Sequence, residues 1–223
     1  MIDLKGVGLA SKKSICTLKR EANSPLTELK PDIADKGAEL MTSSSIRKDR
    51  RVREANVADA PRIAIIHLVS WQVAYRDLIP DHILARLSLQ QRVAFWLQKV
   101  KGPRHLCQVI EENGRIIGWS DSGASRDSDA LKRKVGEVYA IYLDPAAWRR
   151  GAGKELMEAA CQALRQKGYP EMTVWVLEGN QRARRFYESM GFQLEQGIRK
   201  AVARHDNSLP EVRYRLRFEE EEL

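Results

Sequence analysis

The sequence contains few cysteines and no long apolar stretch. Its three cysteines, Cys16, Cys107 and Cys161, lie far apart and form no CxxC pair, so their spacing indicates neither a metal site nor a disulfide framework. No segment approaches the roughly 20 consecutive apolar residues that a membrane helix needs, and the N-terminal region lacks the apolar core of a secretory signal. We therefore expect a cytoplasmic protein without a bound metal.

Charged residues, in contrast, are abundant. Lys and Arg total 38 against 30 Asp and Glu, the net charge is +8, and hydrophobic residues still make up 43%. Residues 1–54 hold 12 basic and 8 acidic side chains, and the remainder holds 26 and 22, so the basic excess is spread along the chain. This balance suits a globular domain that binds an anionic cofactor or nucleic acid, or one that merely has a solvated charged surface.

Composition divides the chain into three parts. Residues 1–45 mix Lys, Ser, Asp, Pro and Gly without a sustained period, so we expect a flexible extension there. Met41 lies near the end of this segment, and one hypothesis is that natural translation starts there. Residues 46–218 are regularly patterned and should form one domain, and residues 219–223 form an acidic tail.

Hydrophobic periodicity in residues 46–218 predicts mixed strands and helices. Asn113-Gly114 between two apolar runs indicates a β-hairpin, and Asp59 before Pro61 is typical of a helix start. Hairpins require antiparallel pairing, whereas strand–helix–strand units allow a parallel pair. We predict the mixed α/β class, with a single twisted mixed sheet flanked by helices on both faces. The expected strands are 50–55, 105–112, 115–121, 136–143, 172–177, one beginning at 192, and 212–218, and the expected helices are 63–75, 81–87, 89–100, 151–167 and 180–190.

The stretch VYAIYLDPAAWRRGAGKELM, residues 138–157, joins a strand to a helix through a glycine-bearing loop. Amides at a helix N-terminus favour an anion, and glycines let the main chain approach a phosphate closely. A Walker loop is excluded because Trp148 replaces its first glycine and Glu155 its Ser/Thr. A dinucleotide-binding fingerprint is weak because Leu156 replaces its third glycine. We interpret the loop as a pyrophosphate cradle.

Two blocks resemble the GNAT superfamily of acyl-coenzyme A-dependent N-acetyltransferases. The first is residues 148–153, WRRGAG, similar to the family signature Gln/Arg-x-x-Gly-x-Gly/Ala except that Trp148 departs at the first position. The second is residues 179–192, similar to Asn-x-x-Ala-x-x-Phe-Tyr-x-x-x-Gly-Phe. The distance between the blocks suits one helix plus one strand, as this fold requires.

The resemblance implies a set of cofactor contacts. Backbone amides of residues 149–154 would hold the pyrophosphate of acetyl-CoA, and the main chain of Ile141 and Leu143 would pair with the pantetheine amides. Asn180 would cap its helix, touch the cofactor, or do both. The basic side chains near the phosphates also have a plain explanation as a solvated charge run. The implied cofactor-binding residues are Ile141, Leu143, Arg149, Arg150, Gly151, Ala152, Gly153, Lys154 and Asn180.

The resemblance also implies catalytic and acceptor-site residues. Tyr187 would protonate the departing coenzyme A thiolate, and Glu137 would take a proton from the acceptor ammonium, directly or through water. Strand alternation would put Glu137 on the same side as Tyr139, Ile141 and Leu143. Trp71 and Tyr75 on the first long helix would line the acceptor site. Each of these side chains also has a structural explanation, in the core or at a strand end.

The expected function is transfer of an acetyl group from acetyl-CoA to a primary amine by direct attack, with both substrates bound and no metal. The acceptor is open: a protein amine or a small amine. Two alternatives stay open, a basic nucleic-acid-binding module centred on residues 47–53 and a coenzyme A-binding domain without catalysis. A homodimer is also left open, and nucleic-acid or membrane partners are not expected.

Overall fold

The computed structural model describes residues 49–102, 105–130, 133–204 and 207–219. The expected extension at 1–45, the alternative start at Met41 and residues 220–223 of the acidic tail lie outside the described residues. No helix in the described ranges is both long and apolar enough to span a membrane.

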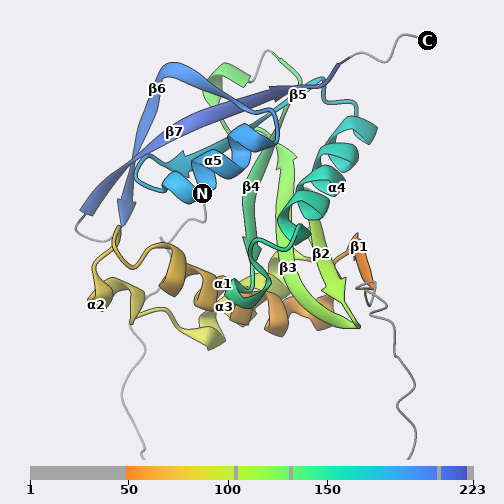
Figure 1. The fold of residues 1–223 in the computed structure, drawn as a ribbon, viewed down its shortest axis with the longest axis vertical. Coiled ribbons are helices and arrows are strands. Elements are labelled where there is room, and N and C mark those ends of the chain that lie inside the picture. Colours follow the sequence, from red (N-terminus) through yellow and green to blue (C-terminus); the bar gives the residue numbers. More distant parts are fainter. Residues whose placement is uncertain (1–48, 103–104, 131–132, 205–206, 220–223) are drawn as a thin grey trace, which may run out of the picture. The chain divides into compact units, whose positions relative to one another are not determined.

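The described strands form one seven-stranded sheet in the order β1-β2-β3-β4-β5-β7-β6 (Figure 1). The hairpin of β2 and β3 forms as expected because Asn113 and Gly114 both take positive φ, 52° and 75°, as a tight two-residue turn requires. The strands are β1 (Arg50–Glu54), β2 (Leu106–Glu112), β3 (Arg115–Ala124), β4 (Val135–Leu143), β5 (Glu171–Leu177), β6 (Gln193–Arg204) and β7 (Asn207–Arg217).

The strands β4 and β5 form the one parallel pair in the described sheet, and they separate after four residue pairs. They pair only from Val135 opposite Glu171 to Val138 opposite Val174. Beyond that point β4 continues beside β3, and β5 continues beside β7. Each strand therefore has a partner on its outer side only, and a gap in main-chain pairing opens in the middle of the sheet. The predicted mixed sheet with a central parallel pair is confirmed.

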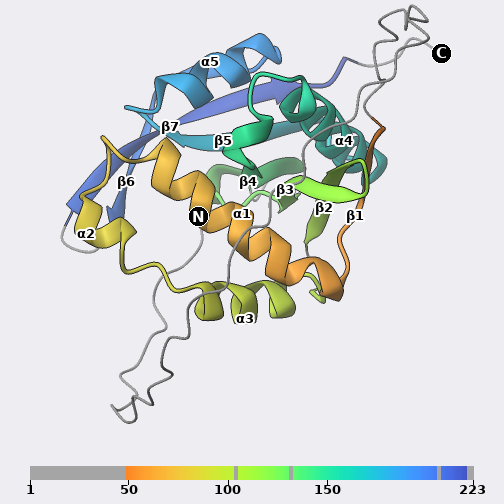
Figure 2. The same cartoon turned by 60° about the horizontal axis from the view of Figure 1, so that its bottom comes forward.

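Helices cover both faces of the sheet, as predicted (Figures 1 and 2). On one face lie α4 (Ala152–Gln166) and α5 (Gln181–Ser189), and on the other α1 (Ala60–Ala74) and α3 (Leu89–Lys99). The short α2 (Asp81–Leu84) ends three residues before the predicted limit, and 3-10 turns occur at Val57–Asp59, Ser128–Ala130 and Pro145–Ala147. The core under α4 and α5 is built around Met157, Leu164, Met172 and Val174, all buried.

The start of α1 differs from the expectation. Asp59 stands at the N-cap position but makes no side-chain cap bond. Its carboxylate instead accepts hydrogen bonds from Arg53 and from the Asn56 amide. Asn56 caps the preceding 3-10 turn. The local pattern therefore marked the start of the helix but not the capping residue, because an arginine from β1 binds the aspartate.

A bulge at Tyr139 reverses the side-chain pattern of β4. Asp121 of β3 faces Ala140, whereas the next residue, Ser122, faces Val138, so Tyr139 is the extra residue. After the bulge, Ile141 packs with the core under α4 and α5, whereas Tyr142 packs with the core under α1. The prediction that Glu137 shares a side with Ile141 and Leu143 is therefore wrong, because one inserted residue flips every later side chain.

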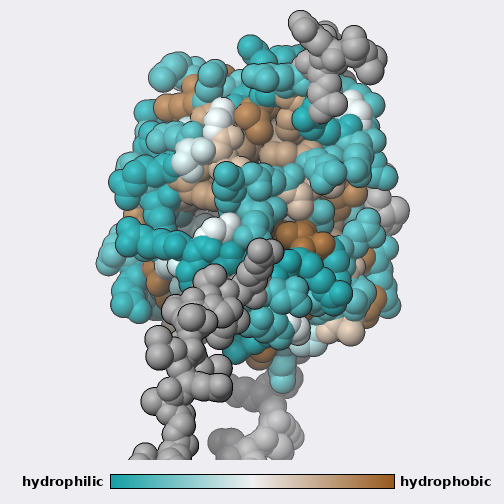
Figure 3. Space-filling view, turned by 45° about the vertical axis from the view of Figure 1, so that its right-hand side comes forward, coloured by the Kyte–Doolittle hydropathy of each residue, from teal (hydrophilic) through white to brown (hydrophobic). Residues whose placement is uncertain are grey.

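The surface is mostly hydrophilic on the face that Figure 3 shows, with apolar residues in small patches. This agrees with the high share of charged residues, 30% of the sequence.

Candidate active site

The loop after β4 brings the chain sharply into α4. The Asp144 carboxylate accepts a hydrogen bond from the Ala146 amide and pairs with Arg62 of α1 at 2.7 Å. Arg149 and Gly151 then adopt left-handed backbone conformations, with φ of 60° and 86°. Glycine takes this conformation without the strain that a Cβ atom brings, so Gly151 is the residue that the turn into the helix requires.

Five consecutive amides at this turn make no hydrogen bond to any acceptor in the described parts of the chain: those of residues 149–153. Gly151 is the N-cap of α4 and has no side chain to cap the helix. The Lys154 amide differs, since it donates to the Gly151 carbonyl at 3.0 Å. Free amides at a helix N-terminus form a binding site for an anion, because the helix dipole adds to their hydrogen bonds.

The basic side chains of the loop differ in whether the protein itself already binds them. Arg150 donates to Glu112 at 2.6 Å and to the Ala146 carbonyl at 3.2 Å, so it braces the loop against β2. Lys154 lies 3.8 Å from Glu158 one turn along the helix, and Arg149 is exposed. Arg149 and Lys154 are thus better placed than Arg150 to meet a ligand from solvent.

Trp148, which departs from the family signature, ties the loop to the end of β4. Its Nε1 donates to the Leu143 carbonyl at 3.0 Å, and Arg182 of α5 lies over its ring, 4.3 Å from the centroid. The Leu143 carbonyl accepts a second bond from Ser70 Oγ at 2.7 Å. The protein itself therefore uses the Leu143 carbonyl that was expected to face the cofactor.

The main chain of β4 faces the gap at alternate residues. The Asp144 amide donates to the Ile117 carbonyl of β3, and hydrogen-bonded pairs alternate along an antiparallel ladder. Residues Tyr142 and Ala140 therefore direct their amides toward β3. Ile141 and Leu143 direct theirs to the other side, where β5 no longer pairs.

Tyr187 lies on α5 in the core on the α4 side of the sheet. Asn180 accepts a hydrogen bond from the Ala183 amide at 3.1 Å, so it caps α5 as predicted. The Tyr187 side chain is buried among Phe186, Phe192 and Tyr214. Burial raises the pKa of Tyr187, with further contributions from Tyr142 and Glu211.

Aromatic side chains gather on the opposite side of the gap, where α1 meets β4. The hydroxyl groups of Tyr75 and Tyr142 lie 3.0 Å apart, and the rings of Trp71 and Tyr75 meet edge to face at 5.2 Å. His67 stacks on Tyr142 and accepts from Trp96 Nε1. Burial also lowers the pKa of His67. His67 is therefore a neutral core residue, whereas Trp71 and Tyr75 pack near Tyr142 of β4.

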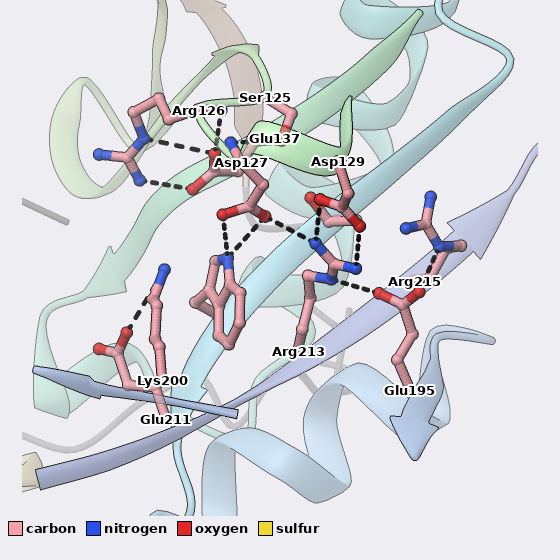
Figure 4. A network of polar contacts seen from close by, with 12 residues as sticks. Ser125, Arg126, Asp127, Asp129, Glu137, Glu195, Lys200, Glu211, Arg213 and Arg215 are labelled. Carbon is pink, nitrogen blue, oxygen red and sulfur yellow. Dashed lines mark hydrogen bonds and ion pairs between the residues drawn. The ribbon is translucent and has the colours of Figure 1, made fainter. Parts of the chain in front are cut away.

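Glu137 is buried, with 1% of its surface exposed. Its Oε1 accepts from Arg126 Nη2 at 2.5 Å, and its Oε2 accepts from the Arg126 amide at 2.9 Å and from Arg126 Nε at 3.3 Å (Figure 4). Both carboxylate oxygens are therefore hydrogen-bonded to one residue of the β3–β4 loop.

Glu211 of β7 is a carboxylate that sequence reasoning missed. It is buried and lies opposite Leu177, the last residue of β5. Because β4 and β5 stop pairing at Val174, Glu211 lies at the end of β5 that borders the gap, and its charge contributes to the raised pKa of Tyr187. Only an alternating pattern marked this segment as a strand, and that pattern does not tell which strand lies beside it.

Comparison with known proteins agrees with this geometry. The family model described as Acetyltransferase (GNAT) family matches residues 71–192. The uncharacterized N-acetyltransferase YuaI of Bacillus subtilis (strain 168) is 33% identical over 129 residues, covering 58% of this chain and 72% of that protein. A mycothiol acetyltransferase of Thermomonospora curvata is 37% identical over 84 residues, which cover 38% of this chain and 26% of that protein.

The fold is similar to that of solved acetyltransferases. The structure of PaiA N-acetyltransferase from Thermoplasma acidophilum in complex with coenzyme A superposes with a TM-score of 0.58 at 16% identity, covering 76% of this chain and 99% of that one. The family match spans more than half of the sequence and includes both motif blocks. The chain belongs to the acetyltransferase (GNAT) family and is an N-acetyltransferase.

Proposed function

We propose that the protein transfers an acetyl group from acetyl-CoA directly to a primary amine while both substrates are bound. The five unbonded amides of residues 149–153, beside the gap between β4 and β5, carry this proposal. They offer the pyrophosphate a set of fixed donors. The solved PaiA N-acetyltransferase is a complex with coenzyme A, and the donor set of this chain suits that ligand.

The gap gives the rest of the cofactor a path. The amides of Ile141 and Leu143 face it, so the pantetheine arm would bind there as an added strand, with Leu143 contributing its amide only. Asn180, next to the gap at the start of α5, would reach the cofactor with its side-chain amide nitrogen. Arg149 and Lys154 would neutralise phosphate charge, and Ala152 and Gly153 would contribute main-chain donors.

Tyr187 would supply the proton for the departing thiolate. Its raised pKa keeps the phenol protonated at neutral pH, so it carries a proton when the thiolate leaves. The amine attacks the thioester carbon only when neutral. The C–N bond then forms and the C–S bond breaks. The thiolate takes the phenolic proton, the acylated nitrogen loses its extra proton to solvent, and solvent returns a proton to the Tyr187 phenolate.

For Glu137 we propose a positioning role, since Arg126 donates to both of its oxygens. The general-base role stays a prediction. Trp71 and Tyr75 would contact the acceptor from the α1 side.

The nucleic-acid alternative is not favoured. Where the structure describes this basic segment, the arginines of β1 are paired with carboxylates, Arg50 with Glu112 and Arg53 with Asp59, so their charges are already partly neutralised. A cytoplasmic location and a homodimer stay predictions.

Calorimetry with acetyl-CoA, followed by an amine screen that detects the free thiol, tests the proposal. Micromolar binding together with amine-dependent thiol release supports it. Binding without release for any amine favours a non-catalytic domain, and salt-dependent oligonucleotide binding without cofactor binding overturns it.

A further inference from the structure

The indole of Trp175 on β5 holds a lysine ammonium on its face. Lys200 Nζ lies 3.6 Å from the ring centroid. The same indole donates from Nε1 to both oxygens of Asp127, at 3.1 and 2.9 Å (Figure 4). A cation over an aromatic face is attracted by the ring quadrupole, most strongly by tryptophan.

Carboxylates complete the surroundings of this ammonium. Lys200 Nζ lies 3.9 Å from Glu211 Oε2, and the Lys200 side chain is 25% exposed. Burial lowers the pKa of Lys200, and the charges of Glu211, Asp127 and Glu137 oppose that shift. The sheet face thus provides a partly dehydrated place for a positive group, with an aromatic wall and negative charge around it.

This cation position lies close to the proposed acceptor site at Trp71 and Tyr75. Glu211 lies between Leu177 of β5 and Lys200 of β6 in the sheet register. Two residues before Glu211, Leu209 packs against the buried cluster of Trp71, against which Tyr75 and Tyr142 also pack. The cation position and the proposed acceptor site are therefore neighbours along β7.

Lys200 is held less firmly than the other cations in this network. Arg213 donates to Asp127, Asp129 and Glu195 at distances of 2.5 to 3.0 Å, whereas the Lys200–Glu211 distance of 3.9 Å is too long for a hydrogen bond. Lys200 also lies on β6, one of the two edge strands of the described sheet.

We infer that Lys200 occupies a cation subsite of the acceptor site, and that the acceptor is an amine with a second positive charge. This rests on the proposed function. The second charge would sit between the Trp175 face and Glu211, in place of the Lys200 ammonium, while the attacking nitrogen reaches the gap. The Lys200 ammonium would then occupy the subsite until the second charge of an acceptor displaces it.

Removal of the internal cation tests the inference. Lys200→Met keeps the length of the stem and empties the subsite. We expect it to tighten binding of 1,4-diaminobutane by at least about tenfold, a change of roughly 1.4 kcal/mol, and to leave n-butylamine binding unchanged, because only the diamine carries a second charge. Calorimetry on the full chain saturated with coenzyme A, which carries no acetyl group to transfer, measures both.

Two further variants make the result specific. Adding Glu211→Gln to Lys200→Met should abolish the gain, and Arg199→Met, which removes a neighbouring cation paired with Glu178, should leave both amines unaffected. An equal gain for both amines, no gain for the diamine, or the same gain with Arg199→Met would overturn the inference. Lys200→Gln replaces Lys200→Met if the latter does not fold.

The proposed function and the cation subsite can be disproved independently of each other. The amines are also titrated without cofactor, so the subsite is measured even in a protein that does not bind acetyl-CoA. Absence of acetyl-CoA binding counts against the proposed function, whereas intact cofactor binding without diamine selectivity counts only against the subsite.

Discussion

At the residue scale, Tyr187 and Glu137 are both buried but differ in their ability to exchange a proton. Tyr187 is packed by aromatic rings and lies close enough to Tyr142 and Glu211 to be influenced by them. Glu137 is fully occupied by Arg126. The Tyr187 phenol carries a proton that it can give. The Glu137 carboxylate is already hydrogen-bonded at both oxygens, so it must first lose a partner to accept a proton.

Replacing Tyr187 by Phe removes the phenolic proton and keeps the ring. We expect kcat to fall about 100-fold, within the usual range for loss of a general acid, and the acetyl-CoA Kd to change little. Thiol-release kinetics and calorimetry measure the two quantities. Unchanged turnover would remove Tyr187 from the mechanism.

Replacing Glu137 by Gln separates a base from a positioning residue. If Glu137 only positions the loop through Arg126, then Arg126→Met should give the same loss of kcat, and neither variant should alter the pH profile. A pH profile that loses its acidic limb in Glu137→Gln alone would instead establish the general base. The full pH dependence of kcat/KM for both variants is the measurement.

At the scale of the element, the N-terminus of α4 depends on one glycine conformation. Gly151 sits at φ 86°, and a Cβ there would meet no atom closer than 3.6 Å. The cost of a side chain is therefore backbone strain rather than a clash. A helix that begins without a side-chain cap leaves its amides for a ligand.

Gly151→Ala should weaken acetyl-CoA binding about tenfold, since left-handed backbone costs an alanine roughly 1–2 kcal/mol and the loop would relax away from it. Gly197→Ala is the matched control, because Gly197 has φ 75° and nothing within 4 Å but lies in β6, outside the loop. Both variants should lose similar stability in denaturant unfolding. Equal acetyl-CoA affinity in the two would contradict the role of the α4 turn.

At the scale of the whole molecule, one buried arginine joins the β3–β4 loop to the last two strands. Arg213 has 4% of its side chain exposed and pairs with Asp127, Asp129 and Glu195 (Figure 4). The same loop carries Arg126, which holds Glu137. The network therefore links the last two strands of the sheet to the loop whose Arg126 holds Glu137.

Arg213→Met should destabilise the protein by about 3 kcal/mol, because it leaves carboxylates without their cation. Chemical denaturation measures this loss. Leu216→Ala, a change of core packing on the same strand, serves as a comparison that should leave the pH dependence of stability unaltered.

The pH dependence has a definite sign. The hydrogen bond from Arg213 lowers the pKa of Asp129, so the folded state prefers the charged carboxylate. Its stabilising contribution is present above the unfolded-state pKa and is lost as pH falls through the folded-state pKa. In Arg213→Met this acid-side loss should shrink. A stability curve as steep in acid as that of the wild type would contradict the assignment.

Much of this protein could be read from residues that are near one another in the chain. Local patterns can be recognised in the sequence. They specify the hairpin at Asn113-Gly114, the Asn180 cap, the glycine turn into α4 and both family blocks. They determined the elements, the fold class and the family.

Only the tertiary structure decided which distant groups meet. The bulge at Tyr139 depends on the register of β3, the Glu137 ion pair depends on a loop that folds back, and Glu211 reaches the gap because β7 pairs with β5. Such contacts join segments far apart in sequence, so no local pattern specifies them; strand register and long-range charge pairing do.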